Sequence, residues 1–260
     1  MGQDGPDDRG GSITPVTALL DERIAAPDRF LTPLYSVTEA ARYLSVPRST
    51  FSAWANGYRD PRIGRSAVSG APILTVVDRG LGRQGPVVPF IGLAEGLVLT
   101  ALRRSKVPMQ RIRPALDRLD EEFGLAHALA SKRLYTDGAE VLFDYAEQDG
   151  DREVSGALRE LVVVRSGQRV FNDVVEAYLR RLEFGEDGYA RLIRLPAYEV
   201  ADVVVDPARG FGQPIFARGG ARIEDALAMF QAGEDLGTVA AEYRVPPEHL
   251  EDAVRVALVG

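Results

Sequence analysis

The chain has 260 residues, a net charge of −7 at pH 7, two histidines and no cysteine. Because there is no cysteine, disulfides and thiolate metal sites are excluded. Two histidines are too few for most zinc sites and argue against a Ser-His-Asp triad. No apolar run approaches the roughly 18 residues of a membrane helix and no N-terminal signal stands out, so we expect a soluble cytoplasmic protein without a metal or other cofactor. Residues 1–30 open with a Gly- and Asp-rich stretch and are expected to be disordered or to form an arm.

The first predicted elements form a helix-turn-helix within residues 35–59, YSVTEAARYLSVPRSTFSAWANGYR. Ser36 or Thr38 can cap the first helix, because either side-chain oxygen can accept hydrogen bonds from free backbone N–H groups. Pro47 then ends this helix, since it restricts the residue before it to extended conformations. Many DNA-binding proteins use a short turn of this kind to place a second helix in the major groove.

The second predicted helix has Ser49 as its cap and ends near Gly57, where glycine suits a left-handed stop. Phe51 and Trp54, three residues apart, are expected to face the core, which leaves polar or small residues on the outside. Such a face suits a DNA groove, although two short helices with a tight turn also occur in proteins that never touch DNA.

Local charge favours the DNA interpretation. Residues 35–83 hold seven arginines and three acidic residues, an excess of four positive charges in a chain of net charge −7. Phosphate neutralisation needs such a patch. The basic segment 59–65 and a predicted strand at 72–77 look like the wing of a winged helix. The expected DNA contacts lie on the second helix and this wing: Arg48, Ser49, Thr50, Ser52, Asn56, Arg59, Arg62 and Arg65.

Two further helices are predicted, one from Phe90 to a stop near Lys106 and one from Pro108 to Gly124. With Ile112-Arg113 leading to Leu116, they resemble the helical segment after the wing in MerR-type regulators. The resemblance covers residues 35–125 and implies that residues 31–125 form a MerR-like winged helix-turn-helix with its following helices. Four arginines here are either phosphate contacts or part of a solvated face: Arg103, Arg104, Arg111 and Arg113.

The next region, residues 126–198, is predicted to form a small antiparallel sheet. Gly138 is expected to mark a turn or bulge between two short strands, and two valine-rich segments further on suggest a hairpin with a short loop. The predicted strands are 134–138, 141–144, 161–164, 169–171 and 189–195, whereas residues 174–182 are either a helix or a further strand.

The C-terminal region, residues 199–260, is predicted to be a helical domain with a second helix-turn-helix. It strongly resembles a small domain of uncharacterised function found in bacterial toxin–antitoxin operons. The recurring turn residues, in order, are Asp206-Pro207, Gly212-Gln213-Pro214, Arg222-Ile223, Gly233, and the A-x-x-Y-x-V run at 240–245.

The charge of this second helix-turn-helix is opposite to that of the first. Residues 202–260 hold ten acidic residues and five arginines, and the last helix carries Glu248, Glu251 and Asp252. Carboxylates repel phosphates, so this region is predicted to dimerise or bind a partner rather than to read DNA.

The two resemblances together point to a VapB-type antitoxin of the large two-domain sort, with an α+β fold. Such a resemblance implies a non-enzymatic protein that binds its own duplex operator and neutralises a ribonuclease toxin of the PIN-domain class. A homodimer is expected, because two copies on a palindrome add their binding energies. Three arginines in Gly-rich sequence are candidates for toxin binding: Arg209, Arg218 and Arg222, the last of which could instead hold the fold together.

Other function classes remain open at this point. A ligand-responsive MerR-like transcription regulator would use the same DNA-binding head, with the central sheet as its small-molecule pocket. A purely structural interaction protein would use neither helix-turn-helix on DNA. An enzyme comes last, because the paired carboxylates Glu121-Glu122 beside Asp120 are typical of a solvated helix face.

Overall fold

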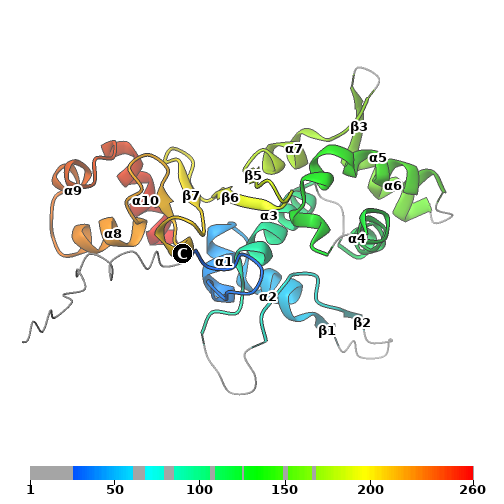
Figure 1. Ribbon diagram of the computed structural model, residues 1–260, viewed down its shortest axis with the longest axis horizontal. Coiled ribbons are helices and arrows are strands. Elements are labelled where there is room, and N and C mark those ends of the chain that lie inside the picture. Colours follow the sequence, from blue (N-terminus) through cyan, green and yellow to red (C-terminus); the bar gives the residue numbers. More distant parts are fainter. Residues whose placement is uncertain are drawn as a thin grey trace, which may run out of the picture.

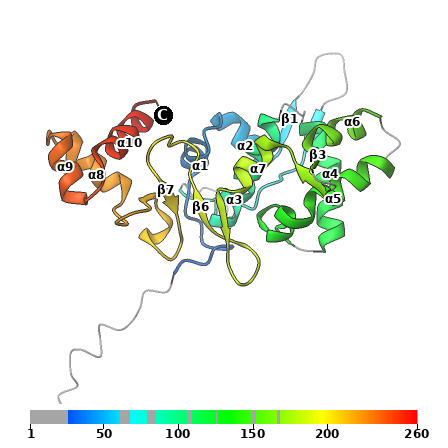
Figure 2. The ribbon, with the colours of Figure 1, turned by 90° about the horizontal axis from the view of Figure 1, so that it is seen from above.

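The computed structural model describes residues 26–60, 68–78, 85–105, 109–124, 126–148, 152–165 and 168–259. Helices and small antiparallel sheets alternate along the chain, which confirms the α+β class. The molecule is elongated (Figure 1): helices α4–α6 lie at one end, helices α8–α10 at the other, and α1–α3 lie between them. Figure 2 shows the same order from above.

The first two helices, α1 (Val37–Tyr43) and α2 (Arg48–Asn56), form the predicted pair. Ser36 caps α1 in a capping box: its side chain accepts from Glu39 N, and the Glu39 carboxylate accepts from Ser36 N at 2.8 Å. The prediction that Ser49 caps α2 is wrong. Pro47 occupies the cap position with φ −57° and ψ 137°, and it makes no side-chain hydrogen bond there because the proline ring has no acceptor atom. Gly57 ends α2 at φ 73°, as predicted.

An antiparallel hairpin follows, formed by β1 (Tyr58–Asp60) and β2 (Val68–Gly70). The strand expected at 72–77 is wrong, because this segment pairs with no strand among the described residues. Its amides bond to other partners: Ile73 N donates to Trp54 O at 2.8 Å and Val77 N to Val87 O at 2.8 Å. The segment therefore runs as a tether from the hairpin past the end of α2.

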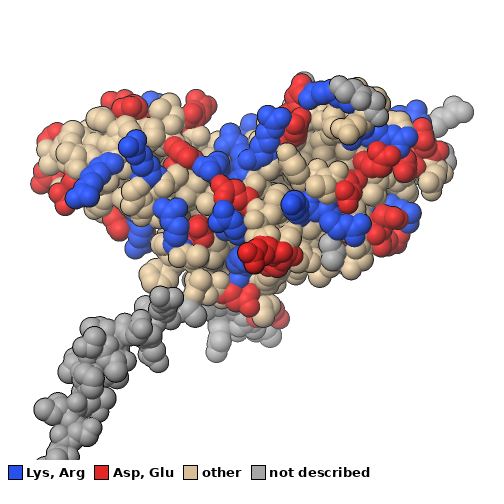
Figure 3. Space-filling view, turned by 45° about the horizontal axis from the view of Figure 1, so that its top comes forward, with Lys and Arg blue, Asp and Glu red and all other residues tan. Residues whose placement is uncertain are grey.

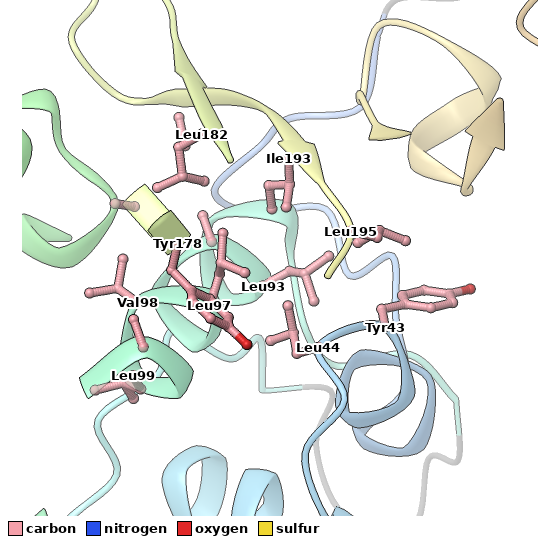
Figure 4. Packing of buried hydrophobic residues seen from close by; sticks show 14 of the residues in the cluster. Tyr43, Leu44, Leu93, Leu97, Val98, Leu99, Tyr178, Leu182, Ile193 and Leu195 are labelled. Atoms are coloured by element: carbon pink, nitrogen blue, oxygen red, sulfur yellow. The ribbon is translucent and has the colours of Figure 1, made fainter. Parts of the chain in front are cut away.

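The core is built around α3 (Phe90–Arg104), which is followed by α4 (Met109–Phe123). Both helices were predicted. The residue expected to begin the second one, Pro108, lies outside the described residues. In Figure 4, Leu93 of α3 lies between Leu44 on the α1 side and Ile193 on the sheet side. Gly96 lets α3 approach α2, since a Cβ there would come within 2.8 Å of the Phe51 ring.

The region after α4 is mainly helical, with a 3-10 turn (Ala128–Ala130), α5 (Lys132–Gln148) and α6 (Arg152–Leu161). The strands expected at 134–138 and 141–144 are therefore wrong. Leu134, Gly138, Leu142 and Ala146 recur every four residues and are all buried, which is a helical repeat. Gly138 is not a turn residue: a Cβ there would come within 2.9 Å of the Leu134 side chain and 3.1 Å of the Phe171 ring.

The predicted valine-rich hairpin is confirmed as β3 (Val162–Arg165) and β4 (Gln168–Phe171), which pair antiparallel. The next segment, left open between helix and strand, contains the helix α7 (Asp173–Leu179). Asn172 caps it by accepting a hydrogen bond from Val175 N at 3.0 Å, so a cap outweighs the strand preference of the valine pair.

A four-stranded antiparallel sheet links the central helices to the C-terminal part. Its strands are β5 (Leu182–Phe184), β6 (Ala190–Arg194), β7 (Val203–Val205) and β8 (Ile215–Phe216), in the order β5-β6-β7-β8. The strand predicted at 189–195 corresponds to β6. One face contributes Ile193, Val205 and Phe216 to the main core, and the other carries the separate apolar cluster Leu192, Val204 and Ile215.

Beyond the sheet lie a 3-10 turn (Gly210–Gly212) and the helices α8 (Ile223–Gln231), α9 (Leu236–Tyr243) and α10 (Pro247–Val259). Asp235 caps α9 by accepting from Thr238 N at 3.0 Å. Asp252 does not form part of a solvated acidic surface, because it is 2% exposed. None of the described helices is both long and apolar enough to cross a bilayer.

A buried polar cluster joins the tether to α3. Glu95 is 3% exposed, and its carboxylate accepts from Thr75 N at 2.6 Å and from Thr75 Oγ1 at 2.9 Å. His127 Nδ1 lies 3.1 Å from Glu95 Oε1, and this hydrogen bond is the main cause that raises the pKa of His127 above its usual 6.5. Burial, with the nearby Glu95 carboxylate, also raises the pKa of Asp120. The described residues hold no group of three or more His, Asp or Glu suited to a metal ion.

The raised pKa of His127 predicts a pH-dependent stability. Because the folded state binds the proton more tightly than the unfolded chain, the stabilisation is complete below about pH 6.5 and is lost as the pH rises through the higher folded pKa. The difference in free energy of unfolding between the wild type and His127→Gln is therefore expected to be larger at acidic than at alkaline pH. Urea unfolding across this range measures it, and a difference that grows with pH would contradict the assignment.

Candidate nucleic-acid and partner interfaces

The outer side of α2 carries the residues predicted to touch DNA. Arg48, Ser49 and Asn56 are exposed, Thr50 and Ser52 are half-buried, and Phe51 and Trp54 anchor the opposite side in the core. Asn56 Nδ2 donates to Ser52 Oγ at 3.2 Å, which orients both polar groups on one face. The structure thus brings these five predicted residues together on one short helix.

An arginine of α3 supports this helix. Arg103 donates from a guanidinium N–H to Thr50 Oγ1 at 2.5 Å. The sequence left Arg103 open between a phosphate contact and a solvated face, whereas the structure gives it a positioning contact. The two residues are 53 apart in the chain, so no local pattern could reveal the pair.

The β1–β2 hairpin is braced in the same way by α4. Arg113 donates to Ala71 O at 2.8 Å, and its guanidinium carbon lies 5.9 Å from the centre of the Tyr58 ring. A Cβ at Gly70 would lie 2.5 Å from the Tyr58 ring and 2.7 Å from the Arg113 guanidinium, so the glycine leaves room for both side chains. Arg59 contributes to the backbone of β1, whereas Arg62 and Arg65 lie outside the described residues.

A second basic surface lies on the open face of the four-stranded sheet. Arg209 and Arg218, two of the predicted toxin-binding residues, line one hollow with Arg191 and Arg194. We call this hollow the arginine face. Figure 3 shows Lys and Arg side chains gathered across the middle of the molecule, with acidic side chains between them. The apolar floor of the hollow consists of Leu192, Val204 and Ala217, and its acidic members are Glu183, Asp202 and Asp206.

The arginines of this face differ in how well they are neutralised. Arg191 pairs with Glu183 at 2.6 Å, and Arg194 pairs with Glu183 at 2.9 Å and Asp202 at 2.8 Å. The hydrogen bond from Arg194 to Asp202 raises the pKa of Arg194 above its usual value.

The other two arginines keep their charge available. Arg209 donates to a backbone carbonyl, Ala217 O, at 3.3 Å. Within the part of the chain that the structure describes, no ion pair joins Arg218. Two guanidinium groups of the arginine face, those of Arg209 and Arg218, therefore have no ion pair among the described residues.

Arg222, the third predicted toxin-binding residue, does not line the arginine face. It precedes α8 and pairs with Glu224 at 2.8 Å and with Asp225 at 3.8 Å, which favours the structural role left open by the sequence. Sequence reasoning missed Arg191 and Arg194. Their place in the predicted strand 189–195 was a usable signal, since two arginines in one short strand must lie on the surface or be paired.

Comparison with known proteins assigns a family. The family model described as "Putative DNA-binding HTH domain" matches residues 33–116, which span α1, α2, the hairpin, α3 and the first half of α4. "Putative antitoxin VapB45" of Mycobacterium tuberculosis is 48% identical over 227 residues, covering 87% of this chain and 94% of that protein. This chain belongs to the VapB45 antitoxin family.

Two further comparisons extend over nearly the same length. "Uncharacterized protein Rv2308" of Mycobacterium tuberculosis is 28% identical over 247 residues, covering 92% of each chain. The crystal structure of Rv2018 from Mycobacterium tuberculosis is 46% identical and superimposes with a TM-score of 0.76, covering 87% of this chain and 99% of that one. The family model thus places residues 33–116 in a DNA-binding helix-turn-helix domain family, and this chain shares its fold with the Rv2018 structure.

Proposed function

We propose that this protein is an antitoxin that binds duplex operator DNA and neutralises a ribonuclease toxin of the PIN-domain class. The observation that carries the proposal is the 48% identity to VapB45 over 94% of that relative, together with the helix-turn-helix match at residues 33–116. The operator would be read by α2, with Arg48 at its exposed start.

The β1–β2 hairpin is proposed to act as the wing of a MerR-like winged helix-turn-helix. It follows α2 directly and is held by Arg113, so it lies close to any DNA on α2. Arg59, Arg62 and Arg65 fall on or between its strands and are proposed to contact phosphates, which fix the register of a protein on DNA.

The arginine face is proposed to hold the toxin. PIN-domain ribonucleases, as the sequence resemblance implies, collect carboxylates at their metal site, and the guanidinium groups of Arg209 and Arg218 can bind carboxylates with two parallel hydrogen bonds. In Figure 1, α2 lies at the lower side of the molecule whereas β6 and β7 lie above α1, so toxin and operator would use different regions.

A homodimer completes the proposal, because two α2 helices on a palindromic operator add their binding energies. Helices α9 and α10 resemble a second helix-turn-helix, but α10 exposes Glu248 and Glu251. These carboxylates disfavour phosphate contacts, so we assign α8–α10 to dimerisation or toxin contact.

Reversing both free charges of the arginine face is expected to weaken the toxin complex about 100-fold, since each lost charged contact costs roughly 1.5 kcal/mol. The variant is Arg209→Glu with Arg218→Glu. Isothermal titration with the purified product of the neighbouring reading frame measures the affinity. The matched control, Lys132→Glu with Arg159→Glu, changes the same charge at exposed positions on α5 and α6 and is expected to bind normally. Equal affinity of both double variants would rule out the arginine face as the toxin site.

A further inference from the structure

A cavity of about 640 Å³ lies between the helix-turn-helix and the last helix. We call it the α1–α10 cavity. One wall is formed by α1, the turn after it and the first residue of α2, and the other by α10 and the loop at 197–199. The volume falls within the range of about 300–1,000 Å³ that is typical of small-molecule sites, which often lie where two units of a fold meet. The α1–α10 cavity lies outside the central sheet, where the alternative ligand pocket was expected.

Both walls are fixed by hydrogen bonds, so the cavity is preformed. On the C-terminal side, the buried Asp252 carboxylate accepts from Val200 N at 2.8 Å and from Ala201 N at 2.9 Å, which ties the loop to α10. On the other side, the Ser36–Glu39 capping box holds the start of α1. A preformed site does not spend binding energy on ordering its own walls.

The lining combines apolar side chains with arginines. Ala41, Val46, Ala197 and Val256 supply the apolar part of the lining. Arg42, Arg48 and Arg255 supply three guanidinium groups.

The carboxylates of the lining are largely engaged by the protein itself. Glu39 accepts the Ser36 amide, and Asp252 accepts two amides and an Arg255 N–H at 3.2 Å. Arg42 packs with its guanidinium carbon 5.5 Å from the Tyr43 ring centre, and within the described ranges no ion pair neutralises Arg42 or Arg48. The third lining carboxylate, Glu199, accepts no hydrogen bond from the described residues. Arg42 and Arg48 therefore lack an ion pair among the described residues, as do two lining carboxylates: Glu39, which is hydrogen-bonded to the Ser36 amide, and Glu199.

We propose that the α1–α10 cavity binds a small organic anion, with an apolar body and one acidic group held by Arg42 and Arg48. This is a regulatory function beyond toxin neutralisation. Arg48 also opens α2, so a bound anion would withdraw that guanidinium from the operator. Ligand binding and DNA binding are then antagonistic, and linkage requires that each weakens the other by the same factor.

The test uses 8-anilino-1-naphthalenesulfonate, an aromatic body with one sulfonate, and the full-length protein. Fluorescence titration is expected to show one saturable site per chain. N-phenyl-1-naphthylamine has the same body without the sulfonate and is expected to bind about tenfold more weakly, because it lacks the charged contact. Equal affinities for the two probes would overturn the anionic class of the ligand.

Two variants locate the site. Ala197→Trp fills the cavity and is expected to abolish the saturable signal, whereas the control Ala241→Trp, at an exposed position on α9, is expected to leave it unchanged. Arg42→Gln removes one cation without filling space and is expected to weaken the probe severalfold but not its neutral analogue. Urea midpoints equal to that of the wild type establish that both variants fold. If the Ala197→Trp variant is folded and binds the probe with the same affinity as the Ala241→Trp variant, the α1–α10 cavity is not the binding site.

The coupling is tested with operator DNA. Saturating probe is expected to weaken operator binding about threefold to tenfold, the size of one lost phosphate contact, and operator is expected to weaken probe binding by the same factor. Probe binding at the cavity with no such reciprocity would overturn the antagonism through Arg48. A protein that binds the probe at the cavity but binds no DNA would instead contradict the proposed function, so the two failures are distinguishable.

Discussion

Replacing Arg48 by Glu is expected to weaken operator binding about 30-fold, or roughly 2 kcal/mol, with little change in the free energy of unfolding. Arg48 is exposed at the first position of α2, and no described contact ties it to the fold, so its charge is free to meet a phosphate. The carboxylate of the variant repels the same phosphate. A gel-shift or anisotropy titration at several salt concentrations measures both the affinity and the number of counterions released.

The control for this prediction is Arg218→Glu, which makes the same charge change on the arginine face. It is expected to retain the wild-type slope of log affinity against log salt, whereas Arg48→Glu is expected to reduce that slope by about one or more. If both variants lost affinity and slope equally, the effect would come from net charge and the assignment of α2 would be wrong.

Truncating Phe51 to Ala is expected to destabilise the protein by about 3–5 kcal/mol, a large part of the stability of a typical domain. Phe51 is 0% exposed, and its ring fills the space that Gly96 leaves between α2 and α3. Few atoms can move into the gap, because the neighbouring α3 residues are themselves fully buried. Urea unfolding with an unchanged m-value measures the loss.

Phe51→Leu is the matched variant, because it keeps an apolar side chain in the same space. It is expected to cost only about 1–1.5 kcal/mol. A Phe51→Ala protein as stable as Phe51→Leu would show that this position is not the packing centre between the two helices.

The helix-turn-helix was predictable because its signals are local. The cap at Ser36 or Thr38, the break at Pro47 and the stop at Gly57 each act within a few residues; the structure confirms the break and the stop and shows that Ser36 is the cap. The exact cap of α2 was not predictable, because serine at 49 and proline at 47 are both common at helix starts and only the backbone decides between them.

The sequence-based predictions failed where a residue contacts a partner that is distant in the chain. Gly138 looked like a turn residue, but it is small because Phe171, 33 positions later, packs against it in the fold. Arg103 and Arg113 looked like surface charges, whereas each supports a backbone or hydroxyl group more than 40 residues away. The arginine face and the α1–α10 cavity depend on the same long-range pairing, so the sequence gives their residues but not their grouping.

The sheet order β5-β6-β7-β8 limits how this protein can be recombined. A boundary at residue 199, suggested by the sequence, separates β6 from β7, which pair through Ile193 with Val205 and Arg194 with Val204. Tyr35 crosses the same boundary, since its hydroxyl donates to Gly212 O at 2.7 Å. A chimaera that exchanged only the C-terminal segment would inherit an orphaned strand edge and an unsatisfied phenol. Grafting a new toxin specificity onto this operator-reading head would therefore require a junction before Leu182, which keeps the whole sheet together, and a backbone carbonyl at the position of Gly212 to accept from Tyr35.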